Sequence, residues 1–424
     1  MNDTGRYKIA VIGAGVSGIV AAHLLQRKHD VTLYEKNKYV GGHTNTIIIP
    51  DGPDAGTPVD TGFIVLNRST YPNFIKFLET LDVPIAMTDM SFSYYCQTTG
   101  LFYATRNMNA LFAQRRNIIR PKYIHFLTEI IRFIRKTKED YDNKRLEDIT
   151  LGRFLKQFNF SDAVIQQFVI PMAAAIWSSP DTAMMEFPMK TFARFYSNHG
   201  LLALGNHPPW HFITGGSHTY VKSFLARFNG HAITNQPVKN IKRENKEVVL
   251  TLADGRKVTY DRVIIATHAD EALAMLSDPS PEETALLSPW KYSKNDTWLH
   301  TDRSFMPPSK RAWASWNYTR KRKGVTDSPI TVTYYMNRLQ QLKTKRDYFV
   351  TLNPAEEIPE SKVIRRISYT HPVFDPGAFD TQKDLAGLNG QRQTCFCGSY
   401  FGYGFHEDGV KSGIQAAKAI GIEP

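Results

Sequence analysis

Three observations predict an α/β fold for this chain of 424 residues. A β-strand, a glycine-rich turn, a helix and a second strand occupy its start. A hairpin followed by an apolar strand lies near residue 260, and an apolar helix introduced by glycines ends the chain. This arrangement is typical of a doubly wound sheet with helices on its faces.

The first strand and helix enclose a turn with three glycines. Residues 8–12 (KIAVI) form the expected strand, and Gly13, Gly15 and Gly18 follow it, before a helix that runs to residue 25. The first glycine allows a tight turn, the second lets the backbone approach a pyrophosphate, and the third lets helix and strand pack closely. Glu35 ends the second strand, where its carboxylate can accept ribose hydroxyls. This unit predicts a Rossmann-like dinucleotide-binding domain.

A second glycine pair indicates which dinucleotide is bound. Residues 35–44 (EKNKYVGGHT) resemble the Glu-x5-Gly-Gly segment of the flavin amine oxidase and phytoene desaturase superfamily. In that superfamily the pair lies against the ribityl-phosphate arm of FAD. His43 stands where the family usually carries arginine, which weakens the link to true amine oxidases.

The resemblance extends to five later segments. They match a strand whose glycine passes beside the isoalloxazine ring, a Gly-Gly turn before a helix, a backbone contact to adenine, a strand ending in Ala-Thr, and a C-terminal motif. In that motif an acidic residue and a glycine open the last helix toward the flavin. In order, these are residues 59–65 (VDTGFIV), 212–217 (FITGGS), 237–238, 260–267 (YDRVIIAT), and 396–398 with 402–413 (GYGFHEDGVKSG).

The resemblance implies non-covalent FAD, because no residue is a convincing attachment point. Cys395 and Cys397 share one face of a predicted strand and are expected in the core. The residues implied to contact FAD are Gly13, Gly15, Val16, Ser17, Gly18, Glu35, Lys36, Gly41, Gly42, His43, Thr44, Thr61, Gly62, Phe63, Val238, Gly398, Glu407, Asp408, Gly409 and Val410.

The combination VGGHT, VDTGF and GYGFHEDG is narrower than the superfamily. It is similar to bacterial predicted NAD/FAD-binding proteins, which are related to the N-terminal part of plant cyclopropane-fatty-acid synthases and to enzymes that oxidise methylated acyl chains. The implied reaction is oxidation or desaturation of a long fatty acyl lipid, methylated or carrying a cyclopropane, by hydride transfer to flavin N5. Two alternatives remain: a flavin amine oxidase acting on a small amine, and a non-redox flavoprotein that assists lipid isomerisation or is a structural partner.

Three side chains are candidates for catalysis. His406 lies beside the flavin in the family alignment and is a candidate general base, because imidazole titrates near neutrality; a structural role at the last helix is the alternative. Asn295 falls where amine oxidases often keep a lysine. Tyr403, with neighbouring aromatic residues, is expected in the wall of the substrate cavity or in the core.

The chain is predicted to interleave two domains. Three FAD-binding pieces, residues 1–90, 207–280 and 390–424, alternate with two pieces of an α+β substrate domain. Of these, residues 91–206 are expected to be mainly helical after Leu111, and residues 281–389 to form a sheet.

Charge, cysteine content and hydropathy limit the kinds of partner and the compartment that we expect. The formal charge is +12, which suggests an anionic partner, yet no nucleic-acid module is present. Only three cysteines occur, none in a metal-binding pattern, so no metal and a reducing compartment are expected. With no apolar run of about 18 residues and no room for a signal peptide before Gly13, we expect a cytoplasmic enzyme; the oligomeric state is open.

Residues 115–145 combine a net charge of +6 with apolar side chains at helical spacing. They are interpreted as a membrane-surface helix that holds anionic headgroups through Arg132, Arg135, Lys136 and Lys138, on the inner face of the membrane. The alternative is an amphipathic helix packed on the substrate domain, with a solvated basic face.

Overall fold

The computed structural model describes residues 5–146, 149–177, 184–202, 208–320, 331–354 and 356–423. Its first layer is a five-stranded, all-parallel sheet in the order β10-β2-β1-β14-β20. Strands far apart in sequence meet in it, so the start, middle and end of the chain form one unit. The strands are β1 (Lys8–Ile12), β2 (Asp30–Tyr34), β10 (His231–Ile233), β14 (Arg262–Ile265) and β20 (Thr394–Phe396).

The central strands are apolar throughout because both faces of this sheet are covered. Ile9 and Val11 belong to the core shared with the helices, whereas Ala10 and Ile12 belong to the core on the opposite face. Such alternation follows from the two-residue period of a strand. The helices are α1 (Val16–Leu25), α2 (Pro72–Thr80), α10 (His218–Arg227) and α15 (His406–Ala419). The opposite face carries an antiparallel sheet of β11 (Val238–Glu244), β12 (Glu247–Leu252) and β13 (Lys257–Tyr260).

Three short helices also pack on this opposite face. Leu287 from α12 (Pro281–Leu287) and Ala378 from α14 (Pro376–Gln382) are buried in the same core as β11 and β12, and α11 (Ala269–Met275) contributes Ala269 and Ala272. Helices α12 and α14 lie within the range 281–389 that the sequence assigned to the substrate domain, so the packing differs from that predicted division.

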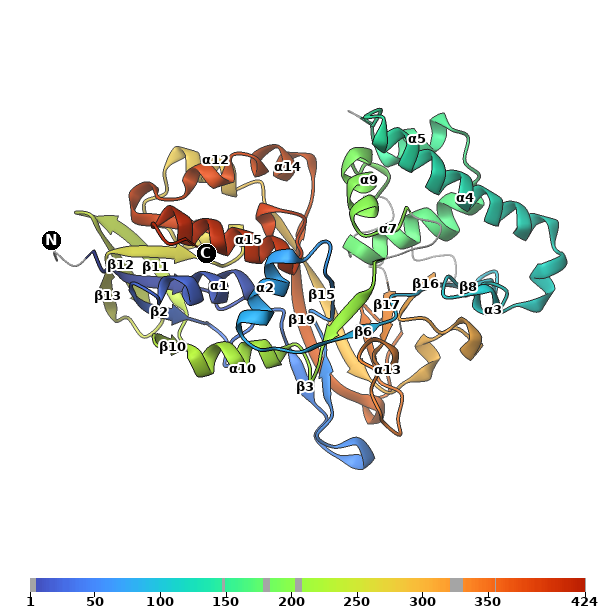
Figure 1. Cartoon of the computed structure of the whole chain (residues 1–424), viewed down its shortest axis with the longest axis horizontal. Coiled ribbons are helices and arrows are strands. Elements are labelled where there is room, and N and C mark those ends of the chain that lie inside the picture. Colours follow the sequence, from blue (N-terminus) through green and yellow to red (C-terminus); the bar gives the residue numbers. More distant parts are fainter. Residues whose placement is uncertain are drawn as a thin grey trace.

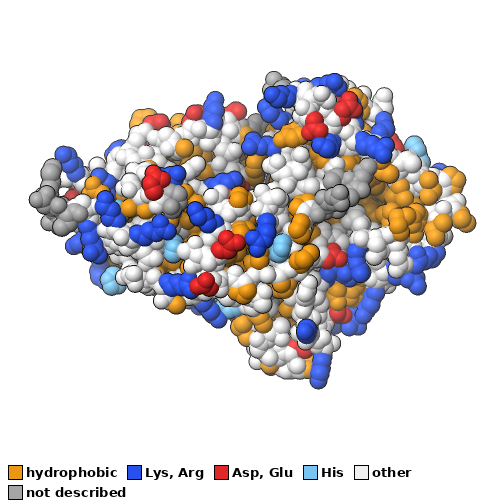
Figure 2. Space-filling model, in the orientation of Figure 1, with side chains coloured by type: hydrophobic (Ala, Val, Ile, Leu, Met, Phe, Trp, Pro, Cys, Tyr) orange, Lys and Arg blue, Asp and Glu red, His pale blue; other side chains and the backbone are white. Residues whose placement is uncertain are grey.

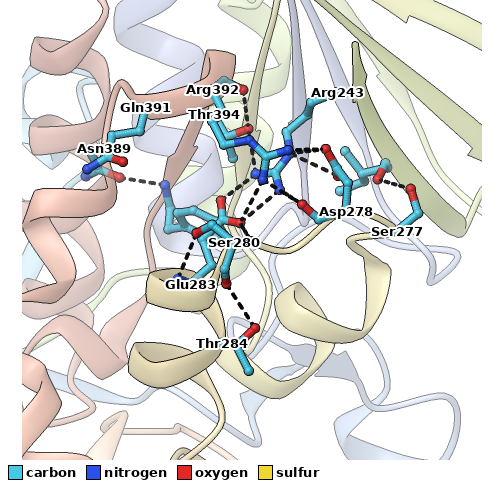
Figure 3. Close-up of polar contacts among 12 residues, drawn as sticks. Arg243, Ser277, Asp278, Ser280, Glu283, Thr284, Asn389, Gln391, Arg392 and Thr394 are labelled. Carbon is cyan, nitrogen blue, oxygen red and sulfur yellow. Dashed lines mark hydrogen bonds and ion pairs between the residues drawn. The ribbon is translucent and has the colours of Figure 1, made fainter.

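A buried ion-pair network joins α12 to the sheet (Figure 3). Arg243 of β11 is 1% exposed; its Nη2 donates to Glu283 Oε2 (2.8 Å) and its Nε to Asp278 Oδ1 (3.1 Å). Burial alone would raise the pKa of the Glu283 carboxyl, but hydrogen bonds from Arg243 and from the Ser280 backbone hold that pKa below its usual value. Arg392, before β20, pairs with Asp278 as well (2.6 Å).

The second large layer is a mixed sheet of seven strands in the order β19-β15-β18-β17-β16-β7-β8. Figure 1 shows its long strands β15 and β19 between the parallel sheet at the left and the helices at the right. The strands are β7 (Phe92–Cys96), β8 (Phe102–Ala104), β15 (Lys291–His300), β16 (Trp316–Arg320), β17 (Thr331–Tyr335), β18 (Phe349–Leu352) and β19 (Val363–Val373); α13 (Met336–Leu339) follows β17.

Helices cover this sheet from residue 108 onward, and they share one large core with it. They are α3 (Met108–Leu111), α4 (Pro121–Asp142), α5 (Leu151–Gln157), α6 (Asp162–Val164), α7 (Ile170–Trp177) and α9 (Met189–Asn198). No helix in the described ranges combines the length and the apolar character that crossing a membrane requires.

Short strands connect the two layers. The predicted strand 59–65 is divided in the structure: β4 (Pro58–Asp60) pairs with β3 (Thr46–Ile48), and β5 (Val65–Asn67) pairs with β9 (Trp210–Ile213), as does β6 (Ile85–Thr88). The chain bends between β4 and β5 to pass His43, where Phe63 N donates to His43 O (2.8 Å). A Cβ atom on Gly62 would lie 2.1 Å from that same oxygen, so glycine is required for this approach.

Candidate functional site

The glycine turn after β1 forms a cradle with an open side. Gly13 has φ +97°, a conformation that glycine adopts without strain. A Cβ on Gly18 would lie 2.0 Å from Gly13 O, whereas a Cβ on Gly15 would meet no atom within 4 Å. The backbone of Gly15 therefore faces free space at the N-terminus of α1. Gly42, from the second pair, lies against it: its Cβ would be 3.1 Å from Gly15 Cα.

A second helix N-terminus lies beside this cradle. Helix α15 packs closely on α1: a Cβ on Gly409 would lie 2.7 Å from Val16 Cγ1, and one on Gly413 would lie 2.5 Å from Ser17 O. Gly409 thus lies beside Val16, and Gly413, one turn later on α15, lies beside Ser17 and Ala21. The two helices therefore run in the same direction, and their N-termini face the same side. Two positive helix ends at one place favour phosphate groups. Val410 is fully buried in the core behind them.

Glu35 lies at the adenosine end expected from the sequence. Its carboxylate is 6% exposed; Oε2 accepts from Ala14 N (3.0 Å) and Oε1 accepts from Asn37 N (2.9 Å) and Asn37 Nδ2 (2.8 Å). Gln236 N donates to Glu35 O (3.0 Å), which brings Val238 and the start of β11 to the same place. Lys36 points elsewhere, because its ammonium group pairs with Glu271 on the surface.

Directly after Gly42, His43 is buried among aromatic side chains of the seven-stranded sheet. Its ring stacks on Tyr369 (centroids 5.0 Å apart) and lies 5.4 Å from His371 and 6.4 Å from His268. Burial, then the neighbouring histidines, lower the pKa of His43 well below its usual value. Nε2 of His43 is buried and has no hydrogen-bond partner in the described part of the chain.

Asn295 belongs to this cluster. It lies on β15, 2% exposed, and its Nδ2 is 3.1 Å from His371 Nδ1, while Asn353 Nδ2 donates to its Oδ1 (2.9 Å). Burial lowers the pKa of His371 to about 4. The cluster is thus uncharged at neutral pH. Although histidines gather here, no group of three or more His, Cys, Asp or Glu among the described residues is arranged to hold a metal ion.

His406 begins α15 and contacts two predicted cofactor segments. Its ring stacks on Phe63 (3.7 Å between centroids), and its Nε2 is 3.0 Å from Thr44 Oγ1, which in turn is 2.6 Å from the hydroxyl of Tyr220. Burial lowers the pKa of His406 to about 3. At neutral pH the His406 imidazole is therefore neutral, stacked on Phe63 and within hydrogen-bond distance of Thr44, and its role as a general base stays a prediction.

The acidic pair that follows is engaged by the protein backbone. Glu407 Oε1 accepts from Asn73 Nδ2 (2.6 Å) and its Oε2 from Phe74 N (2.9 Å), so it stabilises the N-terminus of α2. Asp408 Oδ2 accepts from the backbone N–H groups of Tyr403 (2.9 Å) and Phe405 (3.0 Å), a cap of α15. Burial raises the pKa of Asp408 to about 6. The capping of α2 by Glu407 was not predicted.

The remaining predicted residues surround the same space. Thr61 Oγ1 is 2.9 Å from the hydroxyl of Tyr369. Gly398 N donates to Ser412 Oγ of α15 (2.9 Å). Tyr403 is half-buried, and the guanidinium of Arg194, a residue of α9, lies 5.7 Å from the centroid of its ring. Cys395 and Cys397 are buried in the core, as expected.

Sequence reasoning missed four residues of this site. Asp60 is fully buried and accepts from Ser217 N (2.9 Å) and Gln340 Nε2 (3.0 Å), which joins β4 to α10 and to the segment after α13. Tyr369 and His371 reach His43 from β19, which pairs with β15, whereas His268 reaches it from the segment between β14 and α11. The one signal in the sequence was the position of His268, directly after the Ala-Thr strand.

The residues present fit an FAD molecule. The open space at Gly15 and the two helix N-termini suit the pyrophosphate, Glu35 suits the ribose, and the unpaired Nε2 of His43 suits a polar edge of the flavin. The family model for flavin containing amine oxidoreductase matches residues 16–341. The chain belongs to this family, a class of FAD-dependent oxidoreductases, which confirms the predicted superfamily and cofactor.

Two curated relatives have different substrates. L-amino-acid oxidase of Siganus canaliculatus is 24% identical over 343 residues, covering 77% of this chain and 61% of the relative. A 4,4'-diapophytoene desaturase of Staphylococcus aureus is 54% identical over 180 residues, covering 38% of this chain and 35% of the relative. The chain thus spans about three fifths and about one third of these two proteins.

Solved structures share the fold over nearly the whole chain. Putrescine oxidase matches with a TM-score of 0.68 at 14% identity and 98% coverage of both chains. A CLA-producing fatty acid isomerase from P. acnes matches with a TM-score of 0.63 at 16% identity, covering 96% of this chain and 97% of its own. These likenesses confirm the predicted fold class.

Proposed function

We propose that the protein is an FAD-dependent oxidoreductase that oxidises or desaturates a long apolar acyl chain. The observation that carries this proposal is an aromatic wall beginning directly before His406. Phe405 stacks on Phe195 of α9 (5.0 Å), and Phe374 after β19 lies 5.5 Å from Phe379 of α14, which contacts Phe187 (6.0 Å). A Cβ on Gly404 would be 3.3 Å from the Phe374 ring, so these pairs adjoin.

The charges around the site also favour an apolar substrate. His371 and His406 have pKa values of about 4 and about 3, lowered by burial, so they are neutral at pH 7. Asn295 is neutral as well. The described residues of the histidine cluster offer an ammonium substrate no charged partner, and the nearby carboxylate of Asp60 already accepts from Ser217 and Gln340. An acyl chain requires no charged partner.

One cation lies near the aromatic wall. Arg194 is exposed on α9, next to Phe195, with its guanidinium over Tyr403. A guanidinium in this position suits the carboxylate or phosphate of a lipid headgroup, because it binds such oxygens in a bidentate manner.

The chain's own residues would bind, orient and shield the substrate. Bound FAD would supply the oxidation, taking a hydride from a C–H bond while a proton leaves to a base or to water. The aromatic wall holds the reacting carbons and excludes water. His406 supports Thr44 and Phe63, and the neutral imidazole of His43 offers Nε2 as a hydrogen-bond partner for the cofactor.

The amine oxidase alternative is supported by the match to L-amino-acid oxidase over 77% of this chain and by the shared fold of putrescine oxidase. In that case Arg194 would hold the amino-acid carboxylate. Isomerisation without net oxidation is supported by the shared fold of the fatty acid isomerase.

Anaerobic flavin reduction separates the three candidates. The flavin-loaded protein is mixed with oleoyl, cyclopropane and methyl-branched acyl lipids, and separately with putrescine, cyclohexylamine and L-amino acids. Loss of the oxidised flavin band with the acyl lipids alone is the expected result. Loss with amines or amino acids alone would contradict the proposal, and a shifted double bond without flavin reduction would indicate an isomerase.

A pair of variants tests the aromatic wall. Phe405→Ala should slow reduction by acyl lipids about tenfold by loosening the position of the chain, since small misplacements cost this much. Phe102→Ala, on the distant strand β8, is the matched control and should leave the rate unchanged. Equal effects of the two variants on the reduction rate would contradict a role of the aromatic wall in positioning the acyl chain.

A further inference from the structure

Four apolar side chains stand exposed at one end of the molecule, and we name them the apolar tip: Met108 (67% exposed), Ile118 (52%), Ile119 (84%) and Ile124 (40%). They come from α3, from the 3-10 turn Arg115–Ile119 and from the first turn of α4. Figure 1 places α3 at the end opposite the five-stranded sheet, and Figure 2 shows hydrophobic side chains gathered there beside Lys and Arg. Exposed apolar side chains in such a cluster mark an interaction surface.

The charged side chains in the stretch of chain that carries the apolar tip are all positive. No acidic residue occurs between Asp89 and Glu129, a stretch that contains five Lys and Arg. Arg106 pairs with Asp89 (3.5 Å), but Arg116, Arg120 and Lys122 are exposed without an ion pair to any described residue. These three cations border Ile118, Ile119 and Ile124 along the chain.

The rest of α4 is a weaker candidate for contact with anionic headgroups than the sequence suggested. Arg132 binds Glu129 (2.8 Å) and lies over the Phe160 ring. Lys136 binds Asp140 and Lys138 binds Asp142, both at 2.8 Å. Three of the four cations assigned to headgroups are thus neutralised within the protein. The unpaired charge lies at the start of α4, next to the apolar tip.

We propose that the apolar tip docks on an anionic lipid bilayer, with Ile118 and Ile119 entering the interface and Arg116, Arg120 and Lys122 contacting headgroups. Apolar side chains ringed by cations fit this surface on both counts. A second copy of the chain fits poorly, because a twofold contact would bring the same cations face to face. This docking is independent of the substrate, and it would bring an acyl-chain enzyme to a source of acyl chains.

Sedimentation of the flavin-loaded protein with vesicles tests the proposal. Vesicles of phosphatidylcholine alone are compared with vesicles that contain phosphatidylglycerol, at low and high salt. Binding is expected to the anionic vesicles at low salt and to fall as salt rises, because the Debye length shortens from about 10 Å at 0.1 M to about 3 Å at 1 M. No binding to anionic vesicles at low salt would overturn the proposal.

Variants locate the contact. Ile118→Gln/Ile119→Gln should weaken binding at least tenfold through loss of apolar burial, and each of R116Q, R120Q and K122Q about fivefold. Ile48→Gln/Met87→Gln, at other exposed apolar positions, and Arg135→Gln/Lys138→Gln, on the outer face of α4, are the matched controls. Collapse of binding in the Arg135 and Lys138 variant, with the tip variants unaffected, would overturn the proposal.

Two further measurements distinguish membrane docking from misfolding and from self-association. The single change Ile119→Gln removes the most exposed apolar side chain, so it should weaken binding without changing flavin content or thermal stability. Sedimentation velocity of the free protein detects self-association; a dimer that Ile118→Gln/Ile119→Gln abolishes would assign the tip to a second copy instead.

Discussion

Gly15 and His43 line neighbouring parts of the cofactor cradle. At Gly15 the backbone faces open space, and at His43 a buried imidazole nitrogen lacks a partner in the described chain. Both features lower the stability of the protein without a ligand, because the backbone freedom of glycine and an unpaired buried polar atom each disfavour folding. A bound dinucleotide accounts for both.

The open space at Gly15 gives a sharp variant. Gly15→Val should abolish FAD binding while the fold is kept, because its Cβ meets no protein atom within 4 Å and its φ of −74° suits any residue. Gly387→Val is the control, since its Cβ also meets nothing. Flavin content after purification and thermal unfolding are measured. Full flavin occupancy in Gly15→Val would contradict the assignment of the cradle.

The ion-pair network of Arg243 holds β11, α12 and the segment before β20 together (Figure 3). Replacing one member of a buried ion pair leaves the other charge uncompensated, which costs more than the pair contributes. Two guanidinium groups, those of Arg243 and Arg392, thus take part in the packing on this face of the parallel sheet.

Arg243→Ala should lower the free energy of unfolding by about 3–5 kcal/mol, because Glu283 would remain buried without its partner. Arg256→Ala removes an exposed pair with Asp254 and should change stability by less than about 1 kcal/mol. Urea unfolding of both variants gives the comparison. Similar losses for the two would show that the Arg243 network contributes no more than a surface pair.

Elements with local causes were predicted well from the sequence. The first strand and helix occupy the predicted residues, and β2 ends at Tyr34 next to Glu35, because a glycine turn and an apolar run specify them locally. The division between β4 and β5 was missed, since it depends on His43 passing beside Gly62. The histidine cluster was missed because Asn295 and His371 are 76 residues apart and meet only through strand register.

Buried histidines set the pH response of the whole molecule. Burial lowers the pKa of His199, His300 and His371 to about 4 and that of His406 to about 3. The unfolded chain protonates these residues below pH 6.5, while the folded protein does so only near pH 4 or below. Stability is therefore full above pH 6.5 and is lost as the pH falls toward 4.

At pH 5 each such histidine should cost about 2 kcal/mol relative to pH 7. Asp60 and Asp408, whose pKa values burial raises to about 6, act in the opposite direction and recover about 1.4 kcal/mol each at pH 5. The net expectation is a loss of several kcal/mol, seen as a lower Tm at pH 5. His300→Gln should reduce the loss of stability between pH 7 and pH 5 by about 2 kcal/mol. A wild-type Tm at pH 5 that equals or exceeds the Tm at pH 7 would contradict the expected loss.

We predict that the three separated segments of the chain hold non-covalent FAD at one site. Heat or acid precipitation of the purified protein, followed by quantification of flavin in the supernatant and pellet, measures this directly. The expected result is about one FAD per chain, released into the supernatant. Protein without flavin, or flavin that stays with the precipitated polypeptide, would contradict it.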